Sequence, residues 1–282
     1  MRKSSTKFSL LENEALKKTG RALKQDEAFV ETLLYFFTDV SNVIKFTGRF
    51  LKEFFLPPYE FKEVIKQCYE VGYRSISLVA LTGFIMGLVL TLQSRPTLAE
   101  FGAASLLPRM VSISIIREIG PVITALICAG KIGSGIGAEL GSMKVTEQID
   151  SMEVSGTNPF KYLVVTRTIA TTLMVPFLAI LSDAISLYGS YVGVNINGKV
   201  SLTLFFSQAF HSLSYSDLLP ATIKTFFFGF AIGLIGCFKG YYSSNGTEGV
   251  GQAANTSVVV ASLLIFFIDM IVVQITNILG FN

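Results

Sequence analysis

The sequence is poor in the residue types that build metal sites, disulfide frameworks and catalytic centres. It contains one histidine, His211, and three cysteines, Cys68, Cys128 and Cys237, with no CxxC pair. Cysteines this few and this scattered predict neither disulfides nor a zinc site. No Ser-His-Asp arrangement, HExxH motif or paired-carboxylate motif can be assembled. We therefore expect no metal and no catalytic residue in this chain.

Charged residues are scarce as well, and this excludes an ordinary soluble protein. They make up 15% of the 282 residues, whereas 51% are hydrophobic and the mean hydropathy is +0.56. A soluble domain has about 25% charged residues, so the excess apolar surface needs lipid to cover it. Some five spans of about 20 residues would leave no room for a soluble catalytic domain. The net charge of +3 is small and the basic residues concentrate before Arg74, which favours a membrane surface over nucleic acid as partner.

The sequence predicts an all-α integral membrane protein in three parts. Residues 1–26 form a basic cytoplasmic arm without the apolar segment of a signal peptide. Residues 27–71 alternate apolar and charged side chains at helical spacing, which is typical of amphipathic helices lying on a membrane. Residues 72–282 form the membrane domain. Its five transmembrane helices are expected near residues 75–94, 105–137, 164–193, 219–240 and 254–279.

Lysine and arginine positions predict that the N-terminus is cytoplasmic and the C-terminus lies outside. The second apolar stretch, 105–137, would be ~48 Å long as a helix, beyond the ~30 Å hydrocarbon core. It must therefore tilt, break near Pro121 or project into the cytoplasm. Residues 195–217 are expected to be a polar loop on the outer side.

Glycines recur every fourth residue at Gly133, Gly137 and Gly141. On a membrane helix this spacing makes a smooth face against which another helix packs closely. The surrounding glycine-rich run lacks the GxxxxGK[ST] pattern, so a nucleotide-binding loop is not expected.

Four ionisable residues lie in segments that otherwise appear suited to lipid: Arg117, Glu118, Lys224 and Asp269. Each costs ~2.5–3.5 kcal/mol at the centre of a span, so these side chains should pair or face water. Their charges cancel, which permits one compact network. That network is either a set of structural salt bridges or the polar lining of a substrate path.

Residues 139–153, between the second and third spans, are predicted to form a short amphipathic helix on the cytoplasmic side. Leu140, Met143, Ile149 and Met152 share one stripe, while the acidic side chains remain solvated. The pattern fits an ordinary interfacial helix or a dock for a partner protein.

The segment AELGSMKVTEQIDSMEVSGTNPFKYLVVTR resembles the signature of the MlaE-type permeases, the membrane subunits of MCE-associated ABC lipid transporters. GFIMGLVLTLQ, SIIREIGPVITALICAGKIGSGIGAELG and NGTEGVGQAANTSVVV are similar to the family as well, so the resemblance covers residues 60–280. It implies a homodimeric permease in the bacterial inner membrane that moves phospholipid or a related lipid. Two cytoplasmic ATPase subunits, a periplasmic MCE-domain protein and often a STAS-domain protein would be its partners. ATP and Mg would bind to the ATPase, so no cofactor and no enzyme activity are expected in this chain.

The resemblance also implies roles for individual residues. The ATPase coupling helix would contain Glu139, Met143, Lys144, Glu147, Gln148, Asp150, Met152 and Glu153. The outer end of the first span would border the lipid pocket through Leu90, Gln93, Leu98 and Phe101, where Arg95-Pro96 departs from the family pattern. Arg117 or Lys224 could meet a phosphate headgroup. The alternative is a self-sufficient secondary transporter or channel, in which Glu118 and Asp269 titrate as an ion relay.

Overall fold

The computed structural model describes residues 34, 37–196, 198, 200–211, 213–244 and 246–279. The basic arm predicted at 1–26 lies outside the described residues. The chain divides into two units, Met1–Arg49 and Phe50–Asn282. In the first unit, residues 37–49 are helical.

Every regular element described in the second unit is helical. Its elements are α2 (Phe61–Gly72), η1 (Tyr73–Ser75), α3 (Ile76–Glu100), η2 (Ala104–Leu106), α4 (Leu107–Ser114), η3 (Ile115–Ile119), α5 (Gly120–Cys128), η4 (Ala129–Gly133), α6 (Ser134–Val145), α7 (Gln148–Val154), η5 (Phe160–Val165), α8 (Thr166–Ile196), α9 (Leu202–His211), α10 (Tyr215–Tyr241) and α11 (Thr247–Ile278). Five stretches are long and apolar enough to cross a membrane: Phe61–Glu100, Ala104–Val145, Phe160–Ile196, Tyr215–Tyr241 and Thr247–Ile278. For the described residues, the prediction of an all-helical fold with five helices long and apolar enough to span a membrane is confirmed.

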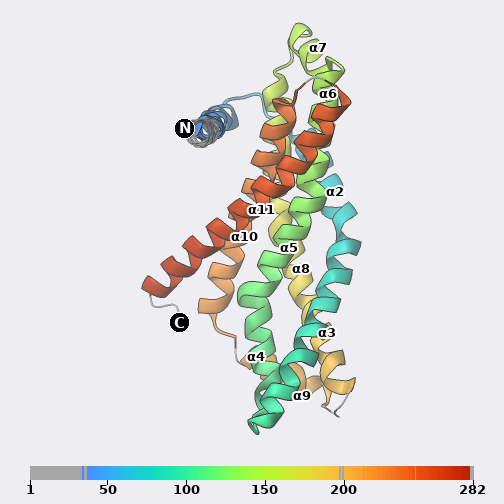
Figure 1. Ribbon diagram of the computed structural model, residues 1–282, viewed down its shortest axis with the longest axis vertical. Helices are drawn as coiled ribbons and strands as arrows, with labels where there is room; N and C mark the ends of the chain where they lie inside the picture. Colours follow the sequence, from blue (N-terminus) through green and yellow to red (C-terminus); the bar gives the residue numbers. More distant parts are fainter. Residues whose placement is uncertain are drawn as a thin grey trace, which may run out of the picture. The chain divides into compact units, whose positions relative to one another are not determined.

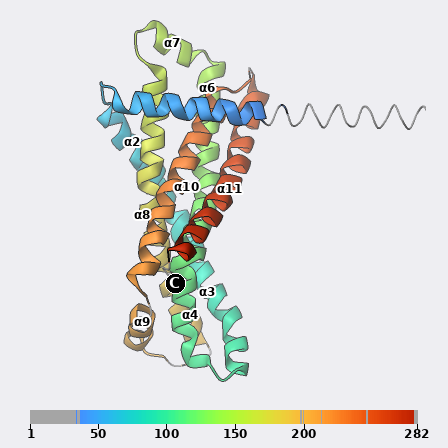
Figure 2. The same ribbon diagram turned by 90° about the vertical axis from the view of Figure 1, so that its left-hand side faces the viewer.

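Helices α8 and α10 form the middle of the bundle. Helix α8 packs against α2, α3 and α10, and α10 packs in addition against α6 and α11. Figure 1 shows α4, α5 and α6 following one another along the bundle, with α7 at one end and α9 at the other. Figure 2 shows the same two ends from the side. Helix α11 leans away from the bundle toward its C-terminal end, where its apolar side chains are largely exposed.

Serines and glycines set the close approach of the first and third spans. Ser186 Oγ donates to the carbonyl of Gly83 over 2.8 Å, and Ser190 Oγ donates to that of Gly87 over 3.1 Å. A Cβ atom added at Gly87 would collide with the backbone oxygen of Ser186. The two helices therefore pack nearly backbone to backbone, as small residues allow in lipid.

The predicted glycine face of the second span lies against the fourth and fifth spans. A Cβ at Gly137 would lie 2.6 Å from Ser257 Oγ, and one at Gly141 would lie 3.4 Å from Val250 Cα, both on α11. At Gly133 the nearest atom is Ile232 Cγ2 of α10, at 3.6 Å. The three positions therefore differ in how tightly they are packed.

The second span is longer than expected and continues through Pro121. It runs from Ala104 to Val145, ~60 Å at helical rise, and so extends beyond the residue 137 at which the predicted span ends. Two π-helical segments, η3 and η4, interrupt its α-helical pattern. Segment η3 directly precedes Gly120-Pro121, where proline cannot donate a backbone hydrogen bond.

The single amphipathic helix predicted at 139–153 is wrong, because the chain breaks inside it. Helix α6 ends at Val145 and α7 begins at Gln148. Between them Glu147 adopts φ 57°, a left-handed conformation that interrupts the helical hydrogen-bond pattern. Residues 139–145 therefore extend the second span, and only the short α7 lies beyond it.

The outer loop predicted at 195–217 is not wholly irregular, since it contains α9. Phe205 and Ala209 of α9 are fully buried. Phe205 packs in an apolar cluster with Leu107, Val111 and Leu187. Helix α9 therefore packs across the end of the bundle opposite α7.

Helix α2 buries its polar stripe and exposes its apolar one. Glu63 and Gln67 are 8% and 6% exposed, whereas Phe61 and Ile65 are 68% and 70% exposed. Such an arrangement suits a helix that faces lipid on one side and polar protein groups on the other.

Candidate functional site

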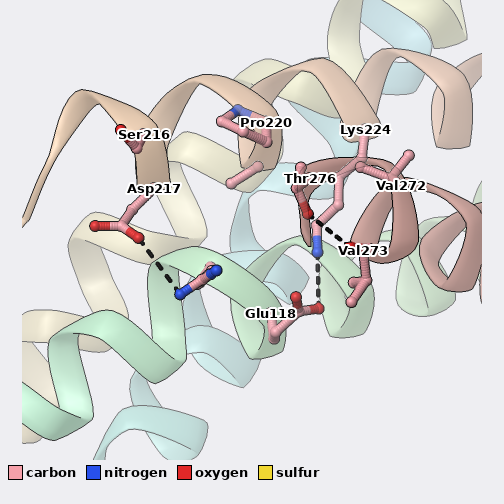
Figure 3. A pocket seen from close by; sticks show the side chains of 10 residues that line it. Glu118, Ser216, Asp217, Pro220, Lys224, Val272, Val273 and Thr276 are labelled. Atoms are coloured by element: carbon pink, nitrogen blue, oxygen red, sulfur yellow. Dashed lines mark hydrogen bonds and ion pairs between the residues drawn. The ribbon is translucent and has the colours of Figure 1, made fainter. Parts of the chain in front are cut away.

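A buried lysine joins three of the five candidate spans. Lys224 Nζ of α10 lies 2.8 Å from Glu118 Oε2 of η3 and 2.8 Å from Asp269 Oδ1 of α11. The side chain of Lys224 is 2% exposed, that of Asp269 is 20% exposed and that of Glu118 is 43% exposed. Figure 3 shows Lys224 and Glu118 facing each other across the site. One cation thus holds two carboxylates from two other helices.

The pairing of these three residues explains how charged side chains are accommodated within membrane-length helices. An ammonium group has three donors and no acceptor, so two carboxylates use two of the three donors. A lysine in a low-dielectric region stays charged only where such partners compensate it. The cluster of Glu118, Lys224 and Asp269 is therefore an ionic link between η3, α10 and α11.

Arg117 lines the same pocket and forms its ion pair with a different residue, Asp217. Its Nη1 lies 3.7 Å from Asp217 Oδ1, and Arg117 is 35% exposed. Asp217 also accepts from the backbone N–H of Ser214 over 3.0 Å, in the capping box that begins α10. The π-helical segment η3 carries both Arg117 and Glu118, and the two residues reach different parts of α10.

The pocket between these residues is lined from three helices. Its lining residues are Arg117, Glu118, Ser216, Asp217, Pro220, Ala221, Lys224, Val272, Val273 and Thr276. Figure 3 shows Ser216 and Asp217 at one end of the pocket and Lys224 at the other, beside the α11 residues Val272, Val273 and Thr276. The structure therefore gathers all of the predicted intramembrane charges near one pocket except Asp269, which reaches it through Lys224.

The predicted coupling residues separate into two groups. Glu147, Gln148, Asp150 and Glu153 are exposed at the end of the bundle that carries α7. Lys144 Nζ lies 2.9 Å from Asp150 Oδ1, so a salt bridge spans the break between α6 and α7. Met143 and Met152 are half-buried.

Glu139 contacts the third span and so belongs to the second group. Its Oε1 accepts from Arg167 Nη2 over 2.8 Å, and Arg167 is 3% exposed. Nearby, Tyr162 donates to Glu63 over 3.0 Å, which links α2 to the same region. A polar cleft of about 650 Å³ lies between α2, α6 and η5, with Met143 and Gln148 on its wall.

The predicted lipid-pocket residues divide between two environments. Leu90 and Leu98 pack against the buried apolar cluster beneath α9. Gln93 and Phe101 are exposed, Phe101 at 80%. Two of the four side chains are therefore partly buried and two are exposed.

Sequence reasoning missed Asp217 and Arg167 as partners. Asp217 fell within a predicted loop, although the Ser214-x-x-Asp217 spacing is a helix-start signal that could have placed it. Arg167 was missed because no local sequence pattern pairs it with Glu139, which lies 28 positions away.

Comparison with known proteins agrees with this architecture. The sequence pattern of the family described as "Permease MlaE" matches residues 64–275. The chain is 39% identical over 217 residues to the "Intermembrane phospholipid transport system permease protein MlaE" of Haemophilus influenzae, covering 76% of this chain and 83% of that protein. It is 34% identical over 255 residues to a "Probable ABC transporter permease protein" of Rickettsia felis, covering 90% of this chain and 94% of the relative. With five membrane-length helices and a match over most of its length, the chain belongs to the MlaE family of ABC transporter permeases.

Proposed function

We propose that this chain is the membrane-spanning subunit of an ABC transporter that moves phospholipid or a related lipid between the inner membrane and a periplasmic MCE-domain protein. The observation that carries the proposal is the family match over residues 64–275, which reaches into all five candidate spans. The Haemophilus relative, named for intermembrane phospholipid transport, supports the substrate class. ATP and Mg would bind to a separate cytoplasmic ATPase, and this chain would hold no cofactor and catalyse no reaction.

The exposed helix α7 supports an ATPase dock at one end of the bundle. It follows α6, which is the continuation of the second span, so a push on α7 would reach the Glu118–Lys224 contact along one helical rod. The contacts of Asp150 with Lys144 and of Glu139 with Arg167 tie that rod to α7 and to α8. In this proposal the α7 end is cytoplasmic, and the α9 end and the C-terminus are periplasmic. The N-terminal amphipathic helices would lie on the cytoplasmic face of the inner membrane.

The charged pocket supports a headgroup contact beside the lipid path. Lys224 is enclosed by two carboxylates, so Arg117, which is 35% exposed, is the better candidate to meet a phosphate. Its 3.7 Å separation from Asp217 is long for an ion pair, and a bidentate phosphate contact would compete with it. A second copy of the chain would complete the path, and a STAS-domain protein would accompany the ATPase.

The test is reconstitution of the chain into liposomes with fluorescent phospholipid, with and without the ATPase and the MCE partner. We expect lipid exchange with the MCE partner only when the ATPase and hydrolysable ATP are both present. The chain alone should hydrolyse no ATP. Lipid exchange at the full rate without the ATPase would contradict the proposal.

The Glu118, Lys224 and Asp269 cluster also favours a second candidate, a secondary transporter that uses these groups as an ion relay. The same liposomes separate the two functions. A secondary transporter would move substrate when a proton gradient is imposed without ATP, and a proton ionophore would abolish that movement. The ATP-driven permease would be unaffected by the ionophore.

A further inference from the structure

A second cavity adjoins the charged pocket along α10, and Ala221 lines both. It encloses about 190 Å³ between α5, α8, α9 and α10. Its wall is largely apolar and includes Pro121, Pro176, Ile180 and Leu218. Among its described lining residues, Asp183 of α8 is the one charged side chain. An apolar cavity with one convergent polar group has the composition of a small-molecule site.

Asp183 has no hydrogen-bond partner for its inner oxygen within the described residues. Oδ1 is buried and unpaired. It lies so close to Gly120 that a Cβ atom there would collide with it. The backbone N–H of Gly120 already donates to the carbonyl of Ile115, and Pro121 has no N–H to offer.

The threonine hydroxyls in the cavity wall are also engaged elsewhere. Thr222 Oγ1 donates to the Leu218 carbonyl over 2.9 Å, and Thr225 Oγ1 donates to the Thr222 carbonyl over 2.7 Å. The donors that line the cavity are therefore used within α10. A carboxyl group that lacks donors in an apolar setting costs free energy, and a donor bound in the cavity would recover part of it by hydrogen bonding to Asp183.

The nearest compensating cation is committed to other partners. Lys224 interacts electrostatically with Asp183, yet its ammonium group bonds Glu118 and Asp269 at 2.8 Å each. Asp183 thus places its carboxyl group at an apolar cavity, while the local lysine is held by two other carboxylates. A ligand that brings its own cation would supply this carboxyl group with an ion-pair partner.

We propose that this cavity binds an amphiphile whose polar end is a primary amine, with the nitrogen donating to Asp183 and the apolar body filling the cavity. A cavity of about 150 Å³ holds a benzene ring, so the 190 Å³ here accepts a short length of alkyl chain or one ring. Two sources supply this chemistry, a free lipophilic amine and the ethanolamine headgroup of a membrane lipid. The inference concerns binding alone and holds whether or not the chain transports lipid.

The test measures saturable binding of radiolabelled dodecylamine to the full chain in phosphatidylcholine nanodiscs, which contain no primary amine. Dodecanol and dodecanoate share the chain length and differ at the polar end. We expect dodecylamine to bind about 10-fold to 100-fold more tightly than either, because a charge-assisted hydrogen bond is lost in both. Asp183→Asn keeps the shape of the side chain and should reduce dodecylamine binding to the level of dodecanol.

Asp217→Asn is the matched control, since it removes the same charge from the other pocket. Its dodecylamine affinity should stay within about twofold of the unsubstituted chain, because Asp217 is not among the residues that line this cavity. Ala179→Phe fills the cavity and should abolish binding, with size-exclusion chromatography reporting that the variant is folded. Equal affinities for dodecylamine and dodecanol, or unchanged dodecylamine binding by Asp183→Asn, would overturn the proposal. Competition by phosphatidylethanolamine would identify the lipid headgroup as a source, and its absence would leave the free amine as the ligand.

Discussion

Arg167 of α8 donates to Glu139 of α6 over 2.8 Å, and the two side chains differ widely in exposure. Arg167 is 3% exposed and Glu139 is 52% exposed. Loss of Glu139 would strand a buried cation, whereas loss of Arg167 would leave a carboxylate that water can reach. The pair joins the third span to the rod that leads to α7, so its two halves have unequal importance for stability.

Glu139→Ala should therefore destabilise the chain more than Arg167→Met does. We expect a loss of about 2 kcal/mol or more for Glu139→Ala, since the buried guanidinium of Arg167 loses its ion-pair partner. For Arg167→Met we expect roughly 1 kcal/mol, because the remaining carboxylate is half exposed and screened. Thermal unfolding of the purified variants measures the difference. The double variant should resemble Arg167→Met, and strictly additive losses would show that the pair is not coupled.

Substitutions in the cluster of Glu118, Lys224 and Asp269 should also differ in how much they destabilise the fold, and here the cation should matter most. Lys224→Met strands two carboxylates, whereas Asp269→Asn or Glu118→Gln leaves Lys224 with one charged partner. Lys224→Met should therefore destabilise the fold most. We expect its free energy of unfolding to fall by about 3 kcal/mol or more, and the unfolding temperature to fall with it. Adding Asp269→Asn to Lys224→Met should restore part of that loss. An equal effect of all three single substitutions would contradict a cluster centred on Lys224.

Glycine-to-alanine substitutions should distinguish the tight contact of α3 with α8 at Gly87 from the looser contact of η4 with α10 at Gly133. A Cβ at Gly87 meets the backbone of Ser186, which cannot move without shifting α8, whereas at Gly133 the nearest atom is Ile232 Cγ2 at 3.6 Å. Gly87→Ala should cost about 1–3 kcal/mol through overpacking, and Gly133→Ala should be nearly neutral. Expression level and melting temperature in detergent report both effects. A tolerated Gly87→Ala would show that α3 and α8 approach less closely than described.

The spans could be predicted from the sequence because apolar length is a property of each segment by itself. Ile76–Glu100 and Thr247–Ile278 illustrate this, since their charge-poor runs exceed the length that lipid requires. The break at Glu147 could not be predicted, because glutamate rarely adopts a positive φ and nothing local marks it. Helix α9 was missed although Leu202, Phe205 and Ala209 recur at helical spacing, because ten residues are too few for a span and polar residues flank them.

The sequence predicts which residues belong to the candidate site better than it predicts how those residues pair. The cost of burying charge predicts that Glu118, Lys224 and Asp269 find partners. It does not predict that Arg117 pairs with Asp217, because that contact depends on the π-helical turn at η3 and on where α10 begins. The orphaned oxygen of Asp183 is likewise a tertiary property, since it follows from the position of Gly120-Pro121 on a neighbouring helix.

The last prediction concerns α7 as the ATPase dock. Replacing both Glu147 and Asp150 with lysine should release the ATPase while the membrane domain stays folded. Both side chains are exposed, and the Lys144–Asp150 salt bridge is exposed enough to contribute at most about 1 kcal/mol. Reversing two charges on a docking surface, in contrast, sets like charges against the partner and weakens binding strongly. The amount of ATPase that co-purifies with the tagged chain measures the effect. Glu100→Lys, an exposed charge reversal at the opposite end of the bundle, should retain the full amount. A doubly substituted chain that still holds its ATPase and transports lipid normally would remove α7 from the interface.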